Sequence, residues 1–304
     1  MSMTTEIDPA RRAQLASTDG STRVPLLELR NISKLFPGVR ALDTVSFSVY
    51  PGEVHMLLGE NGAGKSSLMK VLCGAYRADE GTFHYKGEQV RIGSPADARR
   101  FGISVIFQEF SLVPYLDIAH NLFLGREVAG RIPGTVDHRR MHEEAGKILA
   151  RLGMSLDTHT LVHTLGVAQQ QMIEIAKALS QHAQILVMDE PTAALSDKET
   201  EALFGVIRDL QEKGVSIIYI SHRMAEVFSM GDRITVLRDG KKVASLLPGE
   251  TSSDDLVRLM VGRNVDMSYA RNFCKAPGEL ALEVRAMHAA VSYTHLTLPT
   301  NREV

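Results

Sequence analysis

The sequence has no tryptophan and only two cysteines in 304 residues. Two thiols, Cys73 and Cys274, cannot by themselves build a disulfide framework or a four-ligand zinc site. No stretch approaches the roughly 20 consecutive apolar residues of a membrane-spanning helix, and the first residues lack the apolar run of a secretory signal. We therefore expect a reduced, globular protein that reaches a membrane only through a partner.

An excess of one charge is also missing. Lys and Arg number 34 and Asp and Glu number 36, which gives a net charge of −2. Without a basic surplus there is no long-range field that would attract nucleic acid or anionic lipid, so no nucleic-acid partner is expected. Hydrophobic residues make up 44% and charged residues 23%, as in ordinary globular proteins.

Short apolar segments alternate with helical ones after residue 25. Strands are expected at 26–32, 45–50, 54–58, 103–107, 185–188, 215–220 and 234–237. Helices are expected at about 65–73, after Ser94-Pro95, at 137–152 and at 169–179. Apolar strands separated by helices indicate an α/β fold with a parallel sheet covered on both faces. The helical stretch at about 88–165 is interpreted as an insertion into this core.

One segment carries a phosphate-binding motif between an apolar strand and a helix. The pattern G-x-x-x-x-G-K-[ST] is met by Gly59, Glu60, Asn61, Gly62, Ala63, Gly64, Lys65 and Ser66. Glycines allow backbone N–H groups to face phosphate oxygens, and the helix N-terminus adds a partial positive charge. Lys65 is expected at the β- and γ-phosphates, and the Ser66 hydroxyl at Mg²⁺. Ser67 either adds a phosphate contact or packs internally. This context disfavours an ordinary glycine-rich turn.

Polar residues follow three other expected strands. Asp189 and Glu190 end the strand at 185–188, Gln108 follows 103–107, and His222 follows 215–220. Parallel strands present their carboxyl ends at one edge, where ligands bind. We expect Asp189 and Gln108 to hold Mg²⁺, Glu190 to deprotonate the attacking water, and His222 to contact the γ-phosphate. Taken alone, each would more simply be a solvated or structural side chain.

Taken together, these residues resemble the ATP-binding subunits of ABC transporters, and most closely those of monosaccharide importers of the ribose, xylose and galactose type. The resemblance covers about residues 26–288 and is carried by the segments 34–42, 59–66, 169–179, 189–195, 220–224, 236–240 and 260–263. It implies a P-loop NTPase core of the ABC type with an inserted helical subdomain and a small antiparallel β region.

The resemblance also implies residue roles. Phe36 would stack on adenine, although a core Phe beside a turn is the simpler interpretation, and Gln108 would couple the metal site to the membrane partner. His222 would act as a switch. A signature segment would close over ATP held by an opposing domain, and it comprises Leu165, Gly166, Val167, Ala168 and Gln169. Two positions depart from the family pattern: Gly166 lacks the usual hydroxyl, and Ser196 stands where many relatives have Asp.

The implied function is ATP hydrolysis that energises sugar import, with ATP and Mg²⁺ as cofactors. The implied partners are an integral-membrane sugar permease, a second nucleotide-binding domain fused or in trans, and indirectly an external substrate-binding protein. The implied location is the cytoplasmic face of the inner membrane, as a peripheral subunit. Two alternatives are a soluble ABC-type ATPase without a permease, and a hydrolysis-incompetent fragment that only binds nucleotide.

The domain boundaries follow from composition and resemblance. Residues 1–24 are expected to be a disordered tail and 25–265 the nucleotide-binding domain. Residues 266–288 would be a linker and the start of a truncated second domain, because 282–287 weakly repeats 27–32. Residues 289–304 do not continue the family pattern and are interpreted as a non-native tail. Permease contacts, or internal packing, are expected of Phe110, Leu112, Val113 and Tyr115.

Overall fold

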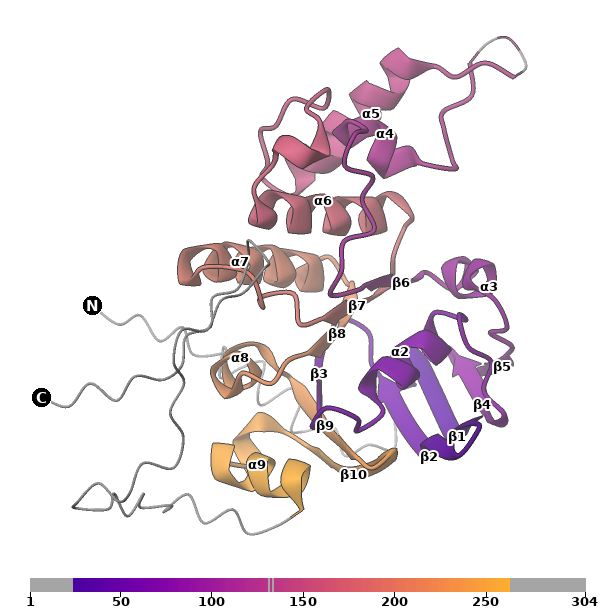
Figure 1. Cartoon of the computed structure of the whole chain (residues 1–304), viewed down its shortest axis with the longest axis vertical. Coiled ribbons are helices and arrows are strands. Elements are labelled where there is room, and N and C mark those ends of the chain that lie inside the picture. Colours follow the sequence, from indigo (N-terminus) through magenta and orange to yellow (C-terminus); the bar gives the residue numbers. More distant parts are fainter. Residues whose placement is uncertain (1–23, 131, 133, 263–304) are drawn as a thin grey trace, which may run out of the picture. The chain divides into compact units, whose positions relative to one another are not determined.

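The computed structural model describes residues 24–130, 132 and 134–262 (Figure 1). The density of contacts between residues divides the chain into two units, residues 1–265 and residues 266–304. Every described residue lies in the first unit. Residues 1–23 of the tail expected at 1–24, and everything expected after residue 262, lie outside the described part. Within that part, no helix combines the length and apolarity needed to cross a bilayer.

A six-stranded sheet forms the centre of the first unit, in the order β10-β9-β3-β8-β7-β6. All its strands run parallel except β10, which pairs antiparallel to β9. The strands are β3 (Val54–Leu58), β6 (Ile103–Ile106), β7 (Ile185–Asp189), β8 (Ser216–Ile220), β9 (Arg233–Arg238) and β10 (Lys241–Leu246). The predicted parallel sheet is confirmed.

A second, antiparallel sheet has the order β2-β1-β4-β5 (Figure 1). Its strands are β1 (Leu27–Phe36), β2 (Val39–Val49), β4 (Glu80–Tyr85) and β5 (Glu88–Val90). The first two are longer than predicted because they form one hairpin that turns at Pro37 and Gly38. Gly38 has a φ of +78°, a left-handed conformation that glycine adopts without a steric penalty. The small antiparallel region is confirmed.

Helices cover the parallel sheet, and short polar side chains define where several of them begin. The α-helices are α2 (Lys65–Leu72), α3 (Pro95–Arg100), α4 (Ile118–Phe123), α5 (His138–Arg151), α6 (Val167–Ser180), α7 (Asp197–Glu212), α8 (Met224–Met230) and α9 (Ser253–Val261). The 3₁₀ turns are η1 (Val162–Thr164) and η2 (Pro248–Glu250). Helix-capping side chains accept a backbone N–H at Ser94, Asp117, Asp137, Ser196 and Ser252.

The insertion expected at about 88–165 has different limits. β5 pairs with β4 and β6 pairs with β7, so residues 88–106 contribute strands to the two sheets. The helical region lies between β6 and β7 and comprises α4, α5 and α6, which contact one another. The predicted start of the insertion is too early because a strand as short as β5 shows almost no alternation of apolar and polar residues in the sequence.

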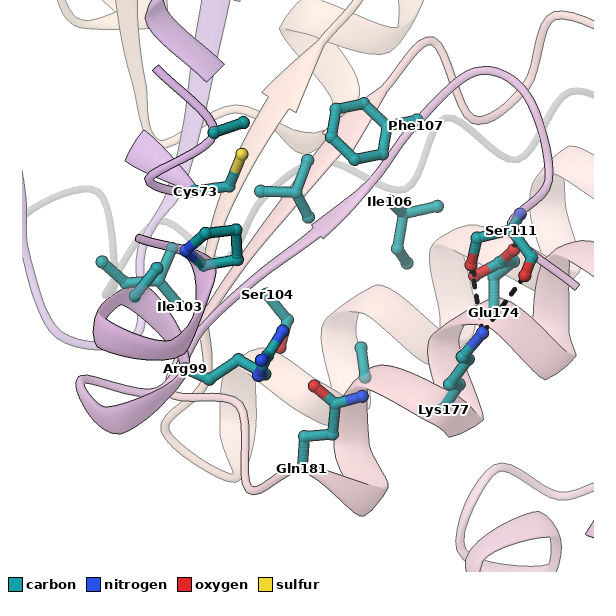
Figure 2. A pocket seen from close by; sticks show the side chains of 15 residues that line it. Cys73, Arg99, Ile103, Ser104, Ile106, Phe107, Ser111, Glu174, Lys177 and Gln181 are labelled. Carbon is teal, nitrogen blue, oxygen red and sulfur yellow. Dashed lines mark hydrogen bonds between the residues drawn. The ribbon is translucent and has the colours of Figure 1, made fainter. Parts of the chain in front are cut away.

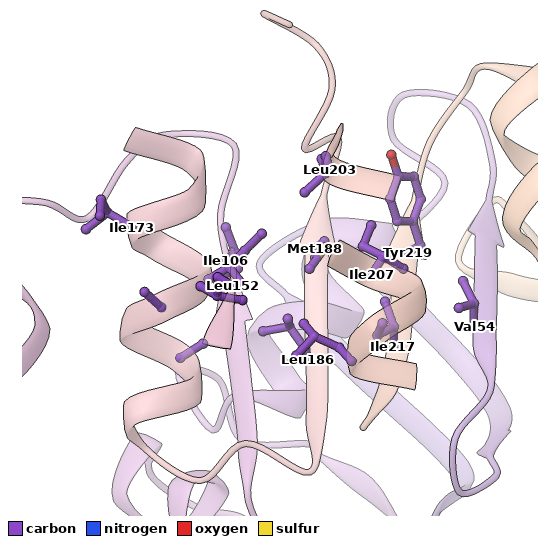
Figure 3. Close-up of a cluster of buried hydrophobic side chains, with 14 of the residues drawn as sticks. Val54, Ile106, Leu152, Ile173, Leu186, Met188, Leu203, Ile207, Ile217 and Tyr219 are labelled. Atoms are coloured by element: carbon purple, nitrogen blue, oxygen red, sulfur yellow. The ribbon is translucent and has the colours of Figure 1, made fainter. Parts of the chain in front are cut away.

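Two hydrophobic clusters occupy the opposite faces of the parallel sheet. Met56 and Leu58 of β3 face the cluster under α5, α6 and α7, whereas Leu57 faces α2 and the antiparallel sheet. Strand residues point alternately to the two faces, so each buried strand serves both clusters. Figure 3 shows the first cluster, in which Leu186, Met188 and Ile217 meet Leu203 and Ile207 of α7.

Candidate functional site

The loop between β3 and α2 has the backbone conformation that its glycines permit. Gly62 and Gly64 have φ angles of +86° and +101°. A Cβ on Gly59 would lie 2.5 Å from the carbonyl oxygen of Leu237, and one on Gly64 would lie 2.7 Å from that of Ala41. Both positions therefore require glycine because the backbone of other strands passes close to the loop.

Two distant segments clamp this loop. The Gly240 N–H, in the turn between β9 and β10, donates to the Ala63 carbonyl at 3.2 Å. The Asp43 N–H of β2 donates in turn to the Gly240 carbonyl at 2.8 Å. The loop is thus held between both sheets, which fixes the direction of its N–H groups.

The N-terminus of α2 is suited to an anion. α2 has no side-chain cap and no acidic residue in its first turn, so its first N–H groups and the helix dipole are available to a phosphate. The Lys65 ammonium donates to the carbonyls of Gly59 and Glu60 at 2.7 and 3.0 Å, above the loop. Ser66 is exposed beside it, and Ser67 is half-buried.

Two carboxylates face this lysine. Burial lowers the pKa of Lys65, an effect opposed by Glu190, Asp189 and Glu60. Burial and the neighbouring Glu190 raise the pKa of Asp189, and Lys65 opposes them. The fold therefore brings Asp189 and Glu190 to Lys65, as the sequence predicts. A cation placed among these groups would relieve the repulsion between the two acids.

Glu190 is aimed at His222. Its backbone has a φ of +46°, which is uncommon for a residue with a side chain and is typical of strained functional positions. The Glu190 N–H donates to the Ile220 carbonyl at 3.0 Å. The Glu190 Oε1 and the His222 Nδ1 lie 2.9 Å apart in a hydrogen bond. The loops after β7 and β8 thus present an acid and an imidazole together.

Gln108 lies just beyond the carboxyl end of β6 and is exposed. Because β6 runs parallel to β7, this end lies at the same edge as Asp189. The residues that follow β3, β6, β7 and β8 therefore all lie at one edge of the sheet, as predicted. The individual roles stay predictions.

Sequence reasoning missed the residue that joins two of these loops. Glu226 of α8 is 4% exposed and accepts hydrogen bonds from three hydroxyls. Its partners are Thr192 (2.7 Å), Ser221 (2.7 Å) and Tyr219 (3.1 Å). Thr192 follows Glu190 and Ser221 precedes His222, so Glu226 fixes both sides of the acid–imidazole pair. Only its position shortly after His222 could have suggested it.

Phe36 lies at the tip of the β1–β2 hairpin and is half-buried. Its ring contacts Tyr76 edge-on at 5.2 Å, and the Lys34 ammonium lies 5.4 Å from the ring centre. The aromatic pair was not anticipated from the sequence, because Tyr76 lies outside every motif. Adenine stacking on Phe36 stays a prediction.

The signature segment crosses the start of α6. Leu165 is buried, whereas Gly166, Val167 and Gln169 are exposed and Ala168 is half-buried. The prediction that the helix begins near Gln169 is wrong: it begins at Val167, with Gly166 as N-cap. The Gln169 side chain accepts the Gly166 N–H at 3.1 Å and so caps this start.

Residues suited to Mg²⁺ are present at this edge. Mg²⁺ takes oxygen ligands and needs few from the protein when substrate phosphates supply others. The Ser66 hydroxyl, the Asp189 carboxylate and the Gln108 amide offer such oxygen ligands, and burial together with the neighbouring Glu190 raises the pKa of Asp189. The donor set therefore fits this ion.

The sequence profile described as "ABC transporter" matches residues 42–193, which is half of the chain and includes the phosphate loop and both acids. The chain belongs to the ABC transporter family.

Curated relatives are similar over most of the described unit. "Ribose import ATP-binding protein RbsA 1" of Rubrobacter xylanophilus is 52% identical over 263 residues, covering 86% of this chain and 52% of the relative. The protein of the same name from Burkholderia ambifaria is 52% identical over 265 residues, covering 86% and 51%. This ABC family chain thus spans about half the length of the curated relatives it matches.

Solved structures of ATP-binding cassettes share the fold. The ADP conformation of MJ1267, an ATP-binding cassette of an ABC transporter, superposes with a TM-score of 0.68 at 28% identity, covering 79% of this chain and 99% of that one. A nucleotide-free cassette superposes with a TM-score of 0.67 at 27% identity, covering 79% and 96%. The P-loop NTPase core of the ABC type is confirmed.

Proposed function

We propose that this chain binds ATP with Mg²⁺ at the shared sheet edge and hydrolyses it to energise sugar import. The observation that carries the proposal is the meeting of Lys65, Asp189, Glu190 and His222 at that edge. Membership of the ABC family and the word "ATP-binding" in the relatives' names support it.

Each residue has a role in the proposed chemistry. The N–H groups of the loop and of α2 bind the phosphates, and Lys65 moves its donors from two carbonyls to the β- and γ-phosphate oxygens. Ser66, Asp189 and Gln108 would hold Mg²⁺, and the ion would supply positive charge to the phosphates. Glu190 accepts the proton of the attacking water, and His222 keeps that carboxylate oriented through its hydrogen bond.

The signature segment is proposed to complete a second nucleotide site on an opposing domain. The exposed Gly166, Val167 and Gln169 and the N-terminus of α6 would face such a domain. Gly166 offers only its backbone N–H, and that donor is already paired with Gln169 at 3.1 Å. The opposing γ-phosphate would therefore compete with Gln169 for this N–H.

A pocket of about 280 Å³ is proposed to receive a segment of the permease. Figure 2 shows Ser111 beside Glu174 and Lys177 of α6, and Phe107, the neighbour of Gln108 in the sequence, farther from them. Glu174 accepts the Ser111 hydroxyl at 3.0 Å, which ties the segment after Gln108 to α6. A permease segment here would lie next to the metal-binding loop.

The residues expected either to contact the permease or to pack internally differ in exposure. Tyr115 is 80% exposed and suits a partner, whereas Leu112 is 8% exposed and packs in the core. The transported compound is proposed to be ribose or a similar monosaccharide, on the relatives' names alone. The test is whether this chain restores ribose uptake in cells that lack their own ribose ATPase subunit. If it restores uptake of xylose or galactose but not of ribose, the proposed sugar is wrong.

The deciding experiment measures ATP binding and phosphate release by the full chain and three variants. Lys65→Ala should lower ATP affinity at least about tenfold, because it removes a charge-assisted donor. Glu190→Gln should bind ATP normally and release phosphate about 10²–10⁴-fold more slowly. Glu201→Gln, at an exposed site on α7, is the matched control and should change neither quantity.

Two outcomes would contradict the proposal. Unchanged turnover in Glu190→Gln would remove Glu190 from its role. ATP binding without turnover, even in the presence of an added opposing domain, would favour a module that only binds nucleotide.

A further inference from the structure

Four histidines in the helical region gather around one carboxylate. The group consists of Asp117, His120, His138, His142 and His159, which come from α4, α5 and the segment before η1. The rings of His142 and His159 stack at 3.7 Å between centres. The His120 ring lies 5.3 Å from that of His138 and 5.8 Å from that of His142. None of these residues belongs to the nucleotide site.

Three members are close enough to share one metal ion. A ligand atom from each of Asp117, His142 and His159 lies within 4.8 Å of the other two. The Asp117 Oδ2 and the His142 Nε2 are 3.9 Å apart, which is too far for a hydrogen bond. Two ligands on one tetrahedral zinc ion are about 3.3 Å apart, given metal–ligand distances of roughly 2.0–2.1 Å. A small side-chain adjustment would bring the atoms to that spacing.

In Asp117 and His142, the other polar atom of the side chain is already held by a hydrogen bond. The Asp117 Oδ1 accepts the His120 N–H at 2.8 Å and lies 2.7 Å from the His120 Nδ1. The His142 Nδ1 lies 2.9 Å from the Thr158 hydroxyl. With Nδ1 as the donor to Thr158, Nε2 carries the lone pair. Metal-binding histidines are usually oriented by such a second hydrogen bond.

We propose that Asp117, His142 and His159 bind a divalent transition metal ion of the zinc class. Imidazole nitrogens favour Zn²⁺, Ni²⁺, Co²⁺ or Cu²⁺ over Mg²⁺ and Ca²⁺, which take oxygen ligands. Water completes the coordination. This site is independent of the proposed ATP hydrolysis.

The ion would brace the helical region. Two backbone hydrogen bonds already join the start of α4 to the 158–160 segment, from Ile118 N–H to Thr160 (3.1 Å) and from Ala119 N–H to Thr158 (3.2 Å). A metal bond to His142 would add α5 to this pair. These segments lie shortly before the signature residues in the chain, so the ion would stabilise the region that presents them.

The test titrates Zn²⁺ into the full chain, without an affinity tag and after treatment with a chelator at pH 7.5. Calorimetry should give one ion per chain, and the midpoint of thermal unfolding should rise with Zn²⁺ concentration, because the ion binds the folded state. The same concentration of Mg²⁺ should leave the midpoint unchanged.

The deciding variant is His159→Phe, at an exposed position, because it keeps the ring on His142 and removes the ligand nitrogen. Its Zn²⁺ affinity should fall at least about tenfold, and that of Thr158→Val by about the same factor. His182→Asn is the control: His182 is exposed and has a φ of +57°, which Asn tolerates.

Three results would overturn the proposal. One is equal Zn²⁺ affinity in the wild-type chain and His159→Phe. Another is an equal loss in His182→Asn. The third is loss of binding in His222→Ala with full binding in His159→Phe, which would place the ion at the nucleotide edge.

Discussion

At Glu190 a left-handed backbone directs one carboxylate toward His222. Such a conformation costs of order 1–3 kcal/mol and persists where the surroundings hold it. Here the surroundings are the hydrogen bond from the Glu190 N–H to Ile220 and the buried Glu226, which accepts from Thr192 and Ser221 on either side. The orientation of the proposed base thus depends on a residue of another helix.

At Phe36 the expected outcome of substitution distinguishes two roles. Phe36→Ala should weaken ATP binding roughly 2- to 10-fold if the ring stacks on adenine, because aromatic pairs contribute about 0.5–1.5 kcal/mol beyond burial. Binding of inorganic triphosphate, measured by competition, should not change. Phe36→Tyr retains the ring and serves as control. Equal weakening for ATP and triphosphate would instead indicate that Phe36 supports the hairpin.

The meeting of the candidate-site residues at one sheet edge could be predicted because they lie in contiguous motifs after apolar strands. The residues from Gly59 to Ser66 and the Asp189-Glu190 pair each form one short segment whose chemistry can be recognised locally. Glu226 and the histidines around Asp117 could not be predicted. Their partners come from separate elements, and only the packing of those elements brings them together.

At the scale of elements, the phosphate loop tolerates no side chain at Gly64. Gly64→Ala would place a Cβ 2.7 Å from the Ala41 carbonyl at a φ of +101°. It should lower the free energy of unfolding by about 1–3 kcal/mol and weaken ATP binding, because the loop must move from β2. Urea unfolding and an ATP-binding assay measure both effects.

The control is a glycine in a different setting. Gly205 lies within α7, and a Cβ there would meet no atom within 4 Å. Gly205→Ala should therefore raise the free energy of unfolding by about 0.5–1 kcal/mol, because alanine favours the helix. A stability loss in Gly205→Ala, or none in Gly64→Ala, would contradict this account of the loop.

Element types were easier to predict than element limits. β3 has the predicted limits because Val54–Leu58 is fully buried, is apolar except at His55, and is bounded by turns. β1 and β2 extend beyond their predicted limits. Several of their additional residues, such as Lys34, are polar and lie in a half-exposed hairpin, so no apolar pattern marks them in the sequence. α5 begins after its cap at Asp137, as predicted, whereas the predicted start of α6 is too late because a glycine cap is a weaker sequence signal than Asp.

At the scale of the described unit, Glu53 links the two sheets. Its carboxylate accepts the Tyr50 N–H (2.8 Å) next to β2, and it contacts His55 of β3 (3.1 Å) and Arg233 of β9 (3.4 Å). Burial alone would raise the pKa of Glu53. The pKa is instead held below its ordinary value by the hydrogen bond from His55 and the charge of His55, and by the Tyr50 N–H and the charge of Arg233.

Stability should therefore depend on Glu53 in a defined pH range. Because its pKa is lower in the folded state, its contribution is complete above about pH 4.5 and is lost as pH falls further. Glu53→Gln should lower the free energy of unfolding by about 2 kcal/mol at pH 7 and should flatten its decline below pH 4.5. Urea unfolding at several pH values tests this, with Glu201→Gln as control. Parallel pH curves for Glu53→Gln and the wild-type chain would contradict it.

The α/β class could be predicted from the alternation of strands and helices, but the joining of the sheets could not. Glu53, His55 and Arg233 follow no motif, and their contacts depend on the strand order β9-β3-β8.

The hydrogen bond from Gly240 to Ala63 has a consequence for biosynthesis. Ribosomes deliver the phosphate loop early, yet the segment that closes over it emerges only after all of α3 to α8. A nascent chain halted before Gly240 would carry the whole phosphate-binding motif and still lack the support that holds it in place. Competence for ATP should thus arise late in translation, once the β9–β10 turn has folded back onto the loop.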